Sequence, residues 1–145
     1  MRFLAFLALC CLSVLAQAQT LPQAPTIAAK SWLLLDYSTG QALASYNPDD
    51  RVEPASLTKL MTAYVVLGAL KEGKLTPTQA LPVSERAWKT PGSRMFIEPK
   101  KPVTVDELLR GMIVQSGNDA CIALAEAVAG SEEAFAQMMN REAQR

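Results

Sequence analysis

The chain has 145 residues, 50% of them hydrophobic, and its 14 basic and 14 acidic side chains give a formal net charge of zero. This length suits one domain, and the balanced charge gives no sign of a nucleic-acid partner. Because the sequence contains no histidine, Ser-His-Asp and Cys-His catalysis and histidine-based zinc sites are excluded.

The N-terminus has the pattern of a secretory signal peptide. The positive start Met1–Arg2 precedes an apolar run from Phe3 to Leu15, and an A-x-A site follows at 16–18. We expect cleavage after Ala18, so that 1–18 is the signal peptide and 19–145 works outside the cytoplasm. An uncleaved membrane anchor is the weaker interpretation, because the run is shorter than the ~20 residues that a span needs.

Two of the three cysteines, Cys10 and Cys11, lie in this predicted signal peptide. A lipoprotein site there is a weaker interpretation, because neither cysteine follows the small residue that such a site needs. Cys121 then has no partner for an internal disulfide, and its apolar neighbours predict a buried, inert thiol.

The first half of the mature part is predicted to be a β-hairpin followed by a long helix. The hairpin strands are 31–36 and 41–46, and the turn between them ends in Gly40. Pro54 precedes an apolar run that predicts a buried helix from Ser56 to about 72, with Gly73 after its end.

The second half is predicted to be mostly helical. A connector with a short edge strand leads to a helical turn opened by Ser84, then to a loop and a short strand at Met95–Ile97. Thr104 and Glu107 form a capping box. The helices predicted after this point run from 104 to about 114, from 119 to 128, and onward from a cap at Ser131.

Ser56 and Lys59 stand three residues apart at the start of the long apolar helix. Residues at i and i+3 share a helix face, so the serine hydroxyl and the lysine amine can point into one pocket. Desolvation lowers the pKa of a lysine, and a neutral lysine can act as a base toward serine. The alternative is an ordinary pair of surface residues, because this spacing is common.

Ser116, Gly117 and Asn118 lie between two predicted apolar helices. A glycine lets the backbone turn sharply, and an asparagine offers both a donor and an acceptor for gripping a peptide group. The alternative is a plain turn between helices.

Together, these segments resemble the D-alanyl-D-alanine carboxypeptidases, which are low-molecular-weight penicillin-binding proteins of the S-x-x-K superfamily. The likeness runs from about Ala28 to the end of the sequence. The matching segments are 34–43, 54–62, 92–96 and 115–120.

The resemblance implies an α/β (α+β) fold of the β-lactamase and transpeptidase type, in which helices cover both sides of an antiparallel sheet and form a helical subdomain. It further implies that Ser56 attacks the bond between two D-alanines of a peptidoglycan stem peptide, that Lys59 takes its proton and that Ser116 relays a proton. Asn118, after Gly117, would hold the substrate amide and support Lys59. β-Lactams would be covalent inhibitors, and no metal or organic cofactor is implied.

One departure concerns the third motif of the family, Lys-Thr-Gly on an inner strand. The only similar segment, Lys89–Gly92, precedes Ser116 and contains a proline that a central strand does not tolerate. We therefore expect an N-terminal part of a periplasmic carboxypeptidase, inactive alone, with any membrane contact through a C-terminal anchor outside this sequence. A β-lactamase and a non-catalytic β-lactam- or peptidoglycan-binding domain are the alternatives.

Overall fold

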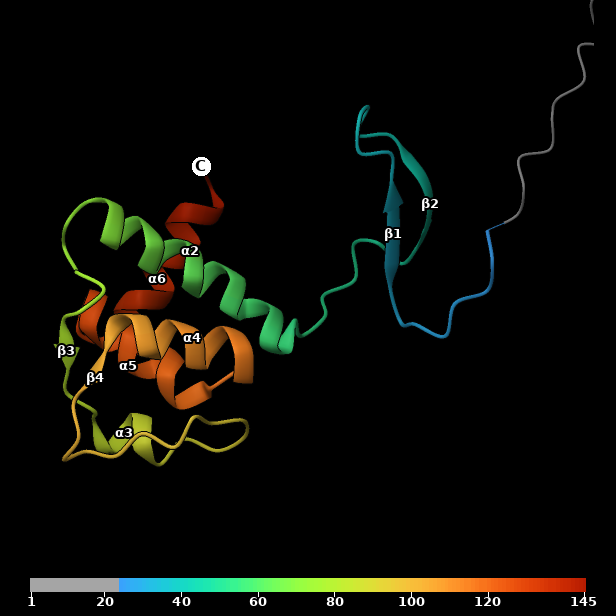
Figure 1. Cartoon of the computed structure of the whole chain (residues 1–145). Helices are drawn as coiled ribbons and strands as arrows, with labels where there is room; N and C mark the ends of the chain where they lie inside the picture. The colour runs from blue at the N-terminus through green and yellow to red at the C-terminus, as the bar shows by residue number, and fades with distance from the viewer. Residues whose placement is uncertain (1–23) are drawn as a thin grey trace, which may run out of the picture. The chain divides into compact units, whose positions relative to one another are not determined.

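The computed structural model of the chain describes residues 24–145, and the predicted signal peptide lies outside them. The described residues divide into two compact units, with the boundary between Val52 and Glu53. The first carries a β-hairpin and the second is mainly helical (Figure 1).

The hairpin pairs β1 (Trp32–Leu35) with β2 (Ala42–Tyr46) in antiparallel register, with an irregularity after Leu34. Asp36 organises its turn, because its carboxylate accepts hydrogen bonds from the backbone and hydroxyl of Thr39 at 2.7 and 2.8 Å. These bonds hold the pKa of Asp36 below its ordinary value. Within residues 24–52 no side chain is fully buried, so the predicted hairpin forms through local turn chemistry and strand pairing.

Helix α5 (Asn118–Ala129) lies at the centre of the second unit and packs against four other helices. These are α2 (Thr58–Lys71), α3 (Glu85–Trp88), α4 (Val105–Gln115) and α6 (Glu132–Ala143). The core between them includes the fully buried side chains of Val66, Leu108, Met112 and Leu124. In Figure 1, α2 and α4 lie side by side in front of α5 and α6.

The predicted helix starts are confirmed by their caps. Ser84 and Ser131 accept backbone N–H bonds at the starts of α3 and α6. Thr104 and Glu107 form both halves of the capping box of α4. Hydrogen bonds from Thr104 hold the pKa of Glu107 below its ordinary value.

The predicted strand at Met95–Ile97 is wrong. This segment has no regular structure, and Phe96 has a left-handed φ of 64°. Its backbone N–H groups donate to the side chain of Asp119 instead of to a strand. The second small sheet pairs β3 (Ala80–Leu81) with β4 (Val103–Thr104). The edge strand within the connector was predicted, whereas β4 was not.

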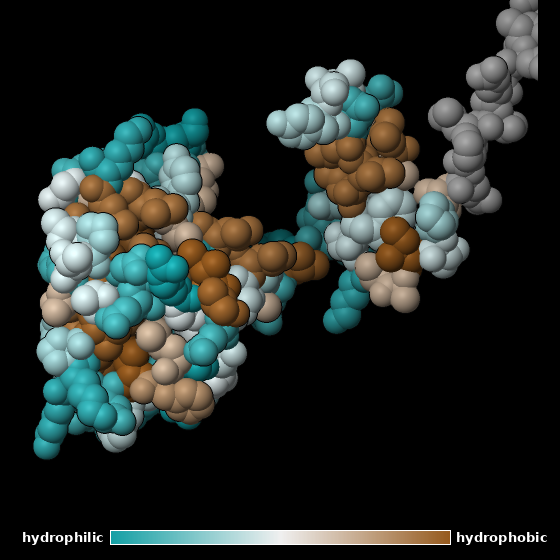
Figure 2. Space-filling model, in the orientation of Figure 1, coloured by the Kyte–Doolittle hydropathy of each residue, from teal (hydrophilic) through white to brown (hydrophobic). Residues whose placement is uncertain are grey.

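The long apolar helix is buried on one face only. Thr62, Val65, Val66 and Ala69 of α2 lie in the core. The opposite face is exposed, and Figure 2 shows hydrophobic residues gathered along it. The large exposed residues there are Leu57 just before α2, and Leu60, Tyr64 and Leu67 within it. Among residues 24–145, no helix combines the length and the hydropathy that a membrane crossing requires.

Candidate active site

Ser56 lies in the 3-10 turn η2 (Ala55–Leu57), directly before α2, and not in the α-helix that was predicted to include it. Lys59, in the first turn of α2, follows three residues later and lies on the same side of the chain. The Lys59 Nζ atom donates to Ser56 Oγ at 3.3 Å. Ser56 is exposed and Lys59 is half-buried, so the amine is only partly withdrawn from solvent.

The turn between α4 and α5 carries the second set of residues. Ser116 ends α4 with a left-handed backbone, φ 56° and ψ 37°. Its Oγ donates to Ser56 Oγ at 2.9 Å. The sharp turn is therefore made at Ser116, whereas Gly117 has an ordinary φ of −61°.

Gly117 is needed for close packing instead. A Cβ atom at this position would lie 3.0 Å from Asp119 Oδ1 and 3.2 Å from the Gly111 carbonyl oxygen. Neither the short aspartate nor the helix backbone can give way easily, so this position favours glycine.

Asn118, the first residue of α5, uses both ends of its amide. Its Oδ1 accepts from Lys59 Nζ at 2.7 Å, and its Nδ2 donates to the Pro91 carbonyl at 2.8 Å. An amide nitrogen carries two hydrogens, so a second N–H remains with which Nδ2 can meet a substrate carbonyl.

These contacts join the four predicted polar side chains into one hydrogen-bonded row. It runs from Asn118 through Lys59 and Ser56 to Ser116. Ser56 Oγ accepts from both neighbours, and two donors on one oxygen stabilise that oxygen when it becomes negative. The tertiary structure thus brings together residues 59 to 60 positions apart in sequence.

A cavity of about 440 Å³ opens beside this row and has a mostly apolar lining. Ser56, Lys59 and Ser116 are the polar residues of its lining. The remaining lining residues are Pro54, Ala55, Leu57, Leu60, Ala63, Met112 and Ile113. A few convergent polar groups in an apolar cleft are typical of a small-molecule site.

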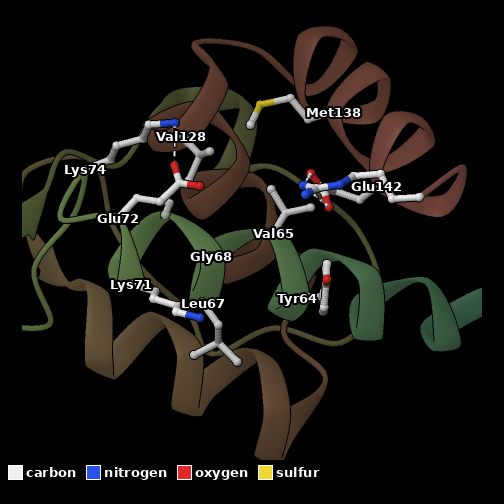
Figure 3. Close-up of a pocket in the computed structure, with 12 residues that line it drawn as sticks. Tyr64, Val65, Leu67, Gly68, Lys71, Glu72, Lys74, Val128, Met138 and Glu142 are labelled. Atoms are coloured by element: carbon white, nitrogen blue, oxygen red, sulfur yellow. Dashed lines mark hydrogen bonds and ion pairs between the residues drawn. The ribbon is translucent and has the colours of Figure 1, made fainter.

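A second cavity, of about 650 Å³, is lined by none of the four polar residues of the row. It lies between α2 and the helices that carry Val128 and Met138 (Figure 3). At its edge, Lys74 pairs with Glu72 at 2.7 Å and holds the pKa of that carboxyl below its ordinary value.

The segment Lys89–Gly92 does not supply a site lysine. The Lys89 ammonium pairs with Glu85 at 2.7 Å on the exposed surface. Pro91 and Gly92 nevertheless contact the site through their backbone: the Pro91 carbonyl binds Asn118, and a Cβ at Gly92 would lie 2.7 Å from Asn118 Nδ2.

Two further residues differ from the sequence-based picture. Cys121, predicted to be buried, is half-buried, and its thiol contacts the Thr62 hydroxyl at 3.5 Å. Asp119, which sequence reasoning missed as a site residue, is 1% exposed and directly follows Asn118. Acidic residues are common at helix starts, so the sequence pattern does not mark Asp119 as a site residue. Its burial in the structure does.

Across residues 24–145, no group of three or more histidine, cysteine, aspartate or glutamate side chains could hold a metal ion.

Known proteins resemble this chain in sequence and in structure. The chain is 48% identical over 142 residues to D-alanyl-D-alanine carboxypeptidase DacC of Escherichia coli, covering 94% of this chain and 35% of DacC. Penicillin binding protein 5 of Haemophilus influenzae superposes with a TM-score of 0.77 at 45% identity, covering 84% of this chain and 36% of that one. A penicillin-binding protein of Listeria monocytogenes in its ampicillin-bound form superposes with a TM-score of 0.71 at 27% identity, covering 84% of this chain and 48% of that one.

The expected penicillin-binding protein fold, of the α+β class, is confirmed by these superpositions. The chain spans about a third of the length of the curated relatives it matches. The family model described as D-alanyl-D-alanine carboxypeptidase matches residues 18–145. On this match, and on relatives at 45–48% identity, the chain belongs to the D-alanyl-D-alanine carboxypeptidase family.

Proposed function

We propose that these residues form the nucleophilic half of a serine-type D-alanyl-D-alanine carboxypeptidase centre. The observation that carries the proposal is the hydrogen-bonded row in which Ser56 Oγ lies 3.3 Å from Lys59 Nζ and 2.9 Å from Ser116 Oγ. A serine with an adjacent amine and no histidine is a known way to activate a nucleophile. The family to which the chain belongs supplies the substrate class.

In the proposed reaction, Lys59 takes the proton of Ser56 as Oγ attacks the carbonyl carbon between two D-alanines of a stem peptide. The carbon–nitrogen bond then breaks, and the leaving amine takes a proton that passes through the Ser116 hydroxyl. The resulting ester on Ser56 is hydrolysed by water. The carbonyl oxygen becomes negative during attack, and the Ser56 backbone N–H is the proposed donor toward it.

Asn118 has two roles in this scheme. Its Oδ1 holds Lys59 in place, and its remaining amide hydrogen can bind the substrate peptide. The apolar lining from Leu57, Leu60 and Ile113 suits the methyl groups of alanine. We further propose, from the pattern of residues 1–18, that the protein acts in the periplasm.

The experiment is to label the full-length protein with a fluorescent β-lactam, to map the adduct by mass spectrometry and to measure D-alanine release from a peptide ending in D-Ala-D-Ala. We expect the adduct on Ser56, and no label and no release in Ser56→Ala. Ser45→Ala, which changes an exposed serine of the hairpin, is the matched control and keeps both activities.

The results also separate the alternatives. An adduct on Ser116 would contradict the assignment of the nucleophile. Rapid hydrolysis of the β-lactam without D-alanine release would indicate a β-lactamase. A stable adduct without D-alanine release would indicate a binding domain.

A further inference from the structure

Asp119 is a buried acidic residue whose carboxylate is fully occupied by backbone donors. Its Oδ1 accepts from Met95 N at 3.0 Å and from Ala120 N at 2.9 Å. Its Oδ2 accepts from Phe96 N at 2.8 Å and from Ile97 N at 3.2 Å. Three consecutive N–H groups of a segment more than 20 residues away therefore converge on one side chain.

The segment Met95–Ile97 depends on this carboxylate. Phe96 has a left-handed backbone, which is unfavourable for a bulky residue and needs support from its surroundings. The segment belongs to no strand, so its N–H groups have no ladder partner. Without the carboxylate, the buried Ile97 donor and the two partly buried donors before it would lose their partners, and an unpaired buried donor is costly.

The same loop also fixes the residue next to Asp119. The Ser93 carbonyl accepts from Asn118 N at 2.7 Å, and the Pro91 carbonyl accepts from Asn118 Nδ2 at 2.8 Å. Ser93 Oγ donates to the Gln115 carbonyl at 2.9 Å. The loop 91–97 is thus bonded to the turn 115–119 at both of its ends.

We propose that Asp119 is a positioning residue for the reaction. Its carboxylate fixes the loop 91–97, the loop fixes the Asn118 side chain through Pro91, and Asn118 holds Lys59 Nζ beside Ser56. The proposal rests on the function proposed above, because it assigns Asp119 a part in that reaction.

A general helix-start effect does not explain this arrangement. Asp106 occupies the same second position of α4 that Asp119 occupies in α5. Asp106 is exposed, however, and among residues 24–145 its side chain pairs with Arg110 alone, at 2.8 Å. The two aspartates occupy the same position in their helices, but only Asp119 accepts hydrogen bonds from the loop 91–97.

The experiment compares Asp119→Asn with the matched control Asp106→Asn in the full-length protein. An asparagine has nearly the same shape as aspartate but only one acceptor oxygen, so it cannot serve both pairs of donors. For folded Asp119→Asn we expect β-lactam acylation to slow by about 10²-fold, the loss that a misplacement of about 1 Å can cause. Asp106→Asn should acylate at the wild-type rate.

A double-mutant cycle tests whether Asp119 acts through Asn118. If it does, Asp119→Asn should slow acylation little further in an Asn118→Ala background. A merely structural role would reduce the folded fraction and leave the rate of folded molecules unchanged. A wild-type rate in folded Asp119→Asn, or fully multiplicative losses in the double variant, would overturn the proposal.

Hydrogen exchange separates failure of this proposal from failure of the proposed function. If the wild-type protein is not acylated at all, the proposed function fails. The linkage from Asp119 through the loop 91–97 to Asn118 is then judged from amide protection alone. We expect Asp119→Asn to lose protection at Met95–Ile97 and also at Asn118 N, which the Ser93 carbonyl holds. Unchanged protection at Asn118 would overturn the linkage.

A second variant covers the case in which Asp119→Asn does not fold. Ser93→Ala removes only the exposed bond between the loop and the Gln115 carbonyl, so it should fold. Ser93→Ala should slow acylation by less than the loss of about 10²-fold expected for Asp119→Asn. In an Asn118→Ala background it should slow acylation little further. A wild-type rate in Ser93→Ala would then count against the proposal.

Discussion

The two halves of the candidate site are held in place by different means. Ser56 lies in a short, exposed turn that has no side-chain cap, next to Leu57, which is 68% exposed. The Ser116–Asp119 half is held by a buried carboxylate and by several hydrogen bonds to the loop 91–97. The half that carries the nucleophile thus has few supports among the described residues, and the opposite half has many.

This difference predicts how substitutions will act. In the nucleophile half, a change should alter the chemistry and leave the free energy of unfolding nearly unchanged. In the supported half, a change should alter both, because Asn118 acts on Lys59 through a packed and hydrogen-bonded frame. Each of the following experiments can sharpen this contrast or break it.

The largest effect is expected from Lys59→Arg. Arginine keeps the positive charge but does not release its proton at working pH, so the acylation rate should fall as far as in Lys59→Ala. Loss of a general base costs about 10²–10⁴-fold. Stopped-flow acylation measures the rate, and Lys71→Arg on the same helix is the neutral control. Near wild-type acylation in Lys59→Arg would show that Lys59 supplies charge and not base function.

The next effect is expected from Gly92→Ala. Gly92 has a left-handed φ of 88°, and an added Cβ would lie 2.7 Å from Asn118 Nδ2. We expect a stability loss of about 1 kcal/mol or more, together with acylation about 10²-fold slower.

Gly130→Ala is the matched control for Gly92→Ala. Gly130 has a similar φ of 82°, but nothing lies within 4 Å of its added Cβ. It should show the stability loss without the rate loss. If both variants acylate at the wild-type rate, the supported half tolerates displacement and the contrast between the halves fails.

A smaller effect is expected from Thr104→Ala, which removes the cap of the helix that ends at Ser116. Loss of a threonine cap costs about 1 kcal/mol, so the urea midpoint should fall while folded molecules acylate normally. Ser131→Ala removes the cap of α6, which carries no site residue, and should behave alike. If only Thr104→Ala slowed acylation, loss of the cap at the start of α4 would have displaced Ser116 at its end.

The smallest effect concerns pH. Hydrogen bonds from Thr104 lower the pKa of Glu107 in the folded state, so ionised Glu107 stabilises the fold. That contribution is complete above the ordinary glutamate pKa of about 4.3 and is lost as the pH falls through the lowered value. The stability difference between wild type and Glu107→Gln should therefore shrink between pH 6 and pH 3, as measured by urea unfolding. A constant difference would contradict the assignment.

Local chemistry in the sequence determined much of what the structure shows. The hairpin turn, the caps at Ser84, Thr104 and Ser131, and the order of the helices depend on residues close together in the chain. The candidate residues Ser56, Lys59, Ser116 and Asn118 were also identifiable, because two short motifs carry them.

Only the tertiary structure decided how these motifs meet and what supports them. The row from Asn118 to Ser116 contains hydrogen bonds between side chains that the sequence separates by 59 and 60 residues. Asp119 was not identifiable, because an aspartate at a helix start has the same local pattern whether it is exposed, like Asp106, or buried. Met95–Ile97 was mistaken for a strand for the same reason: its apolar residues suit a strand, but its N–H groups bind a carboxylate from a distant helix. Burial and long-range hydrogen bonding depend on which segments pack together, and local sequence does not encode that.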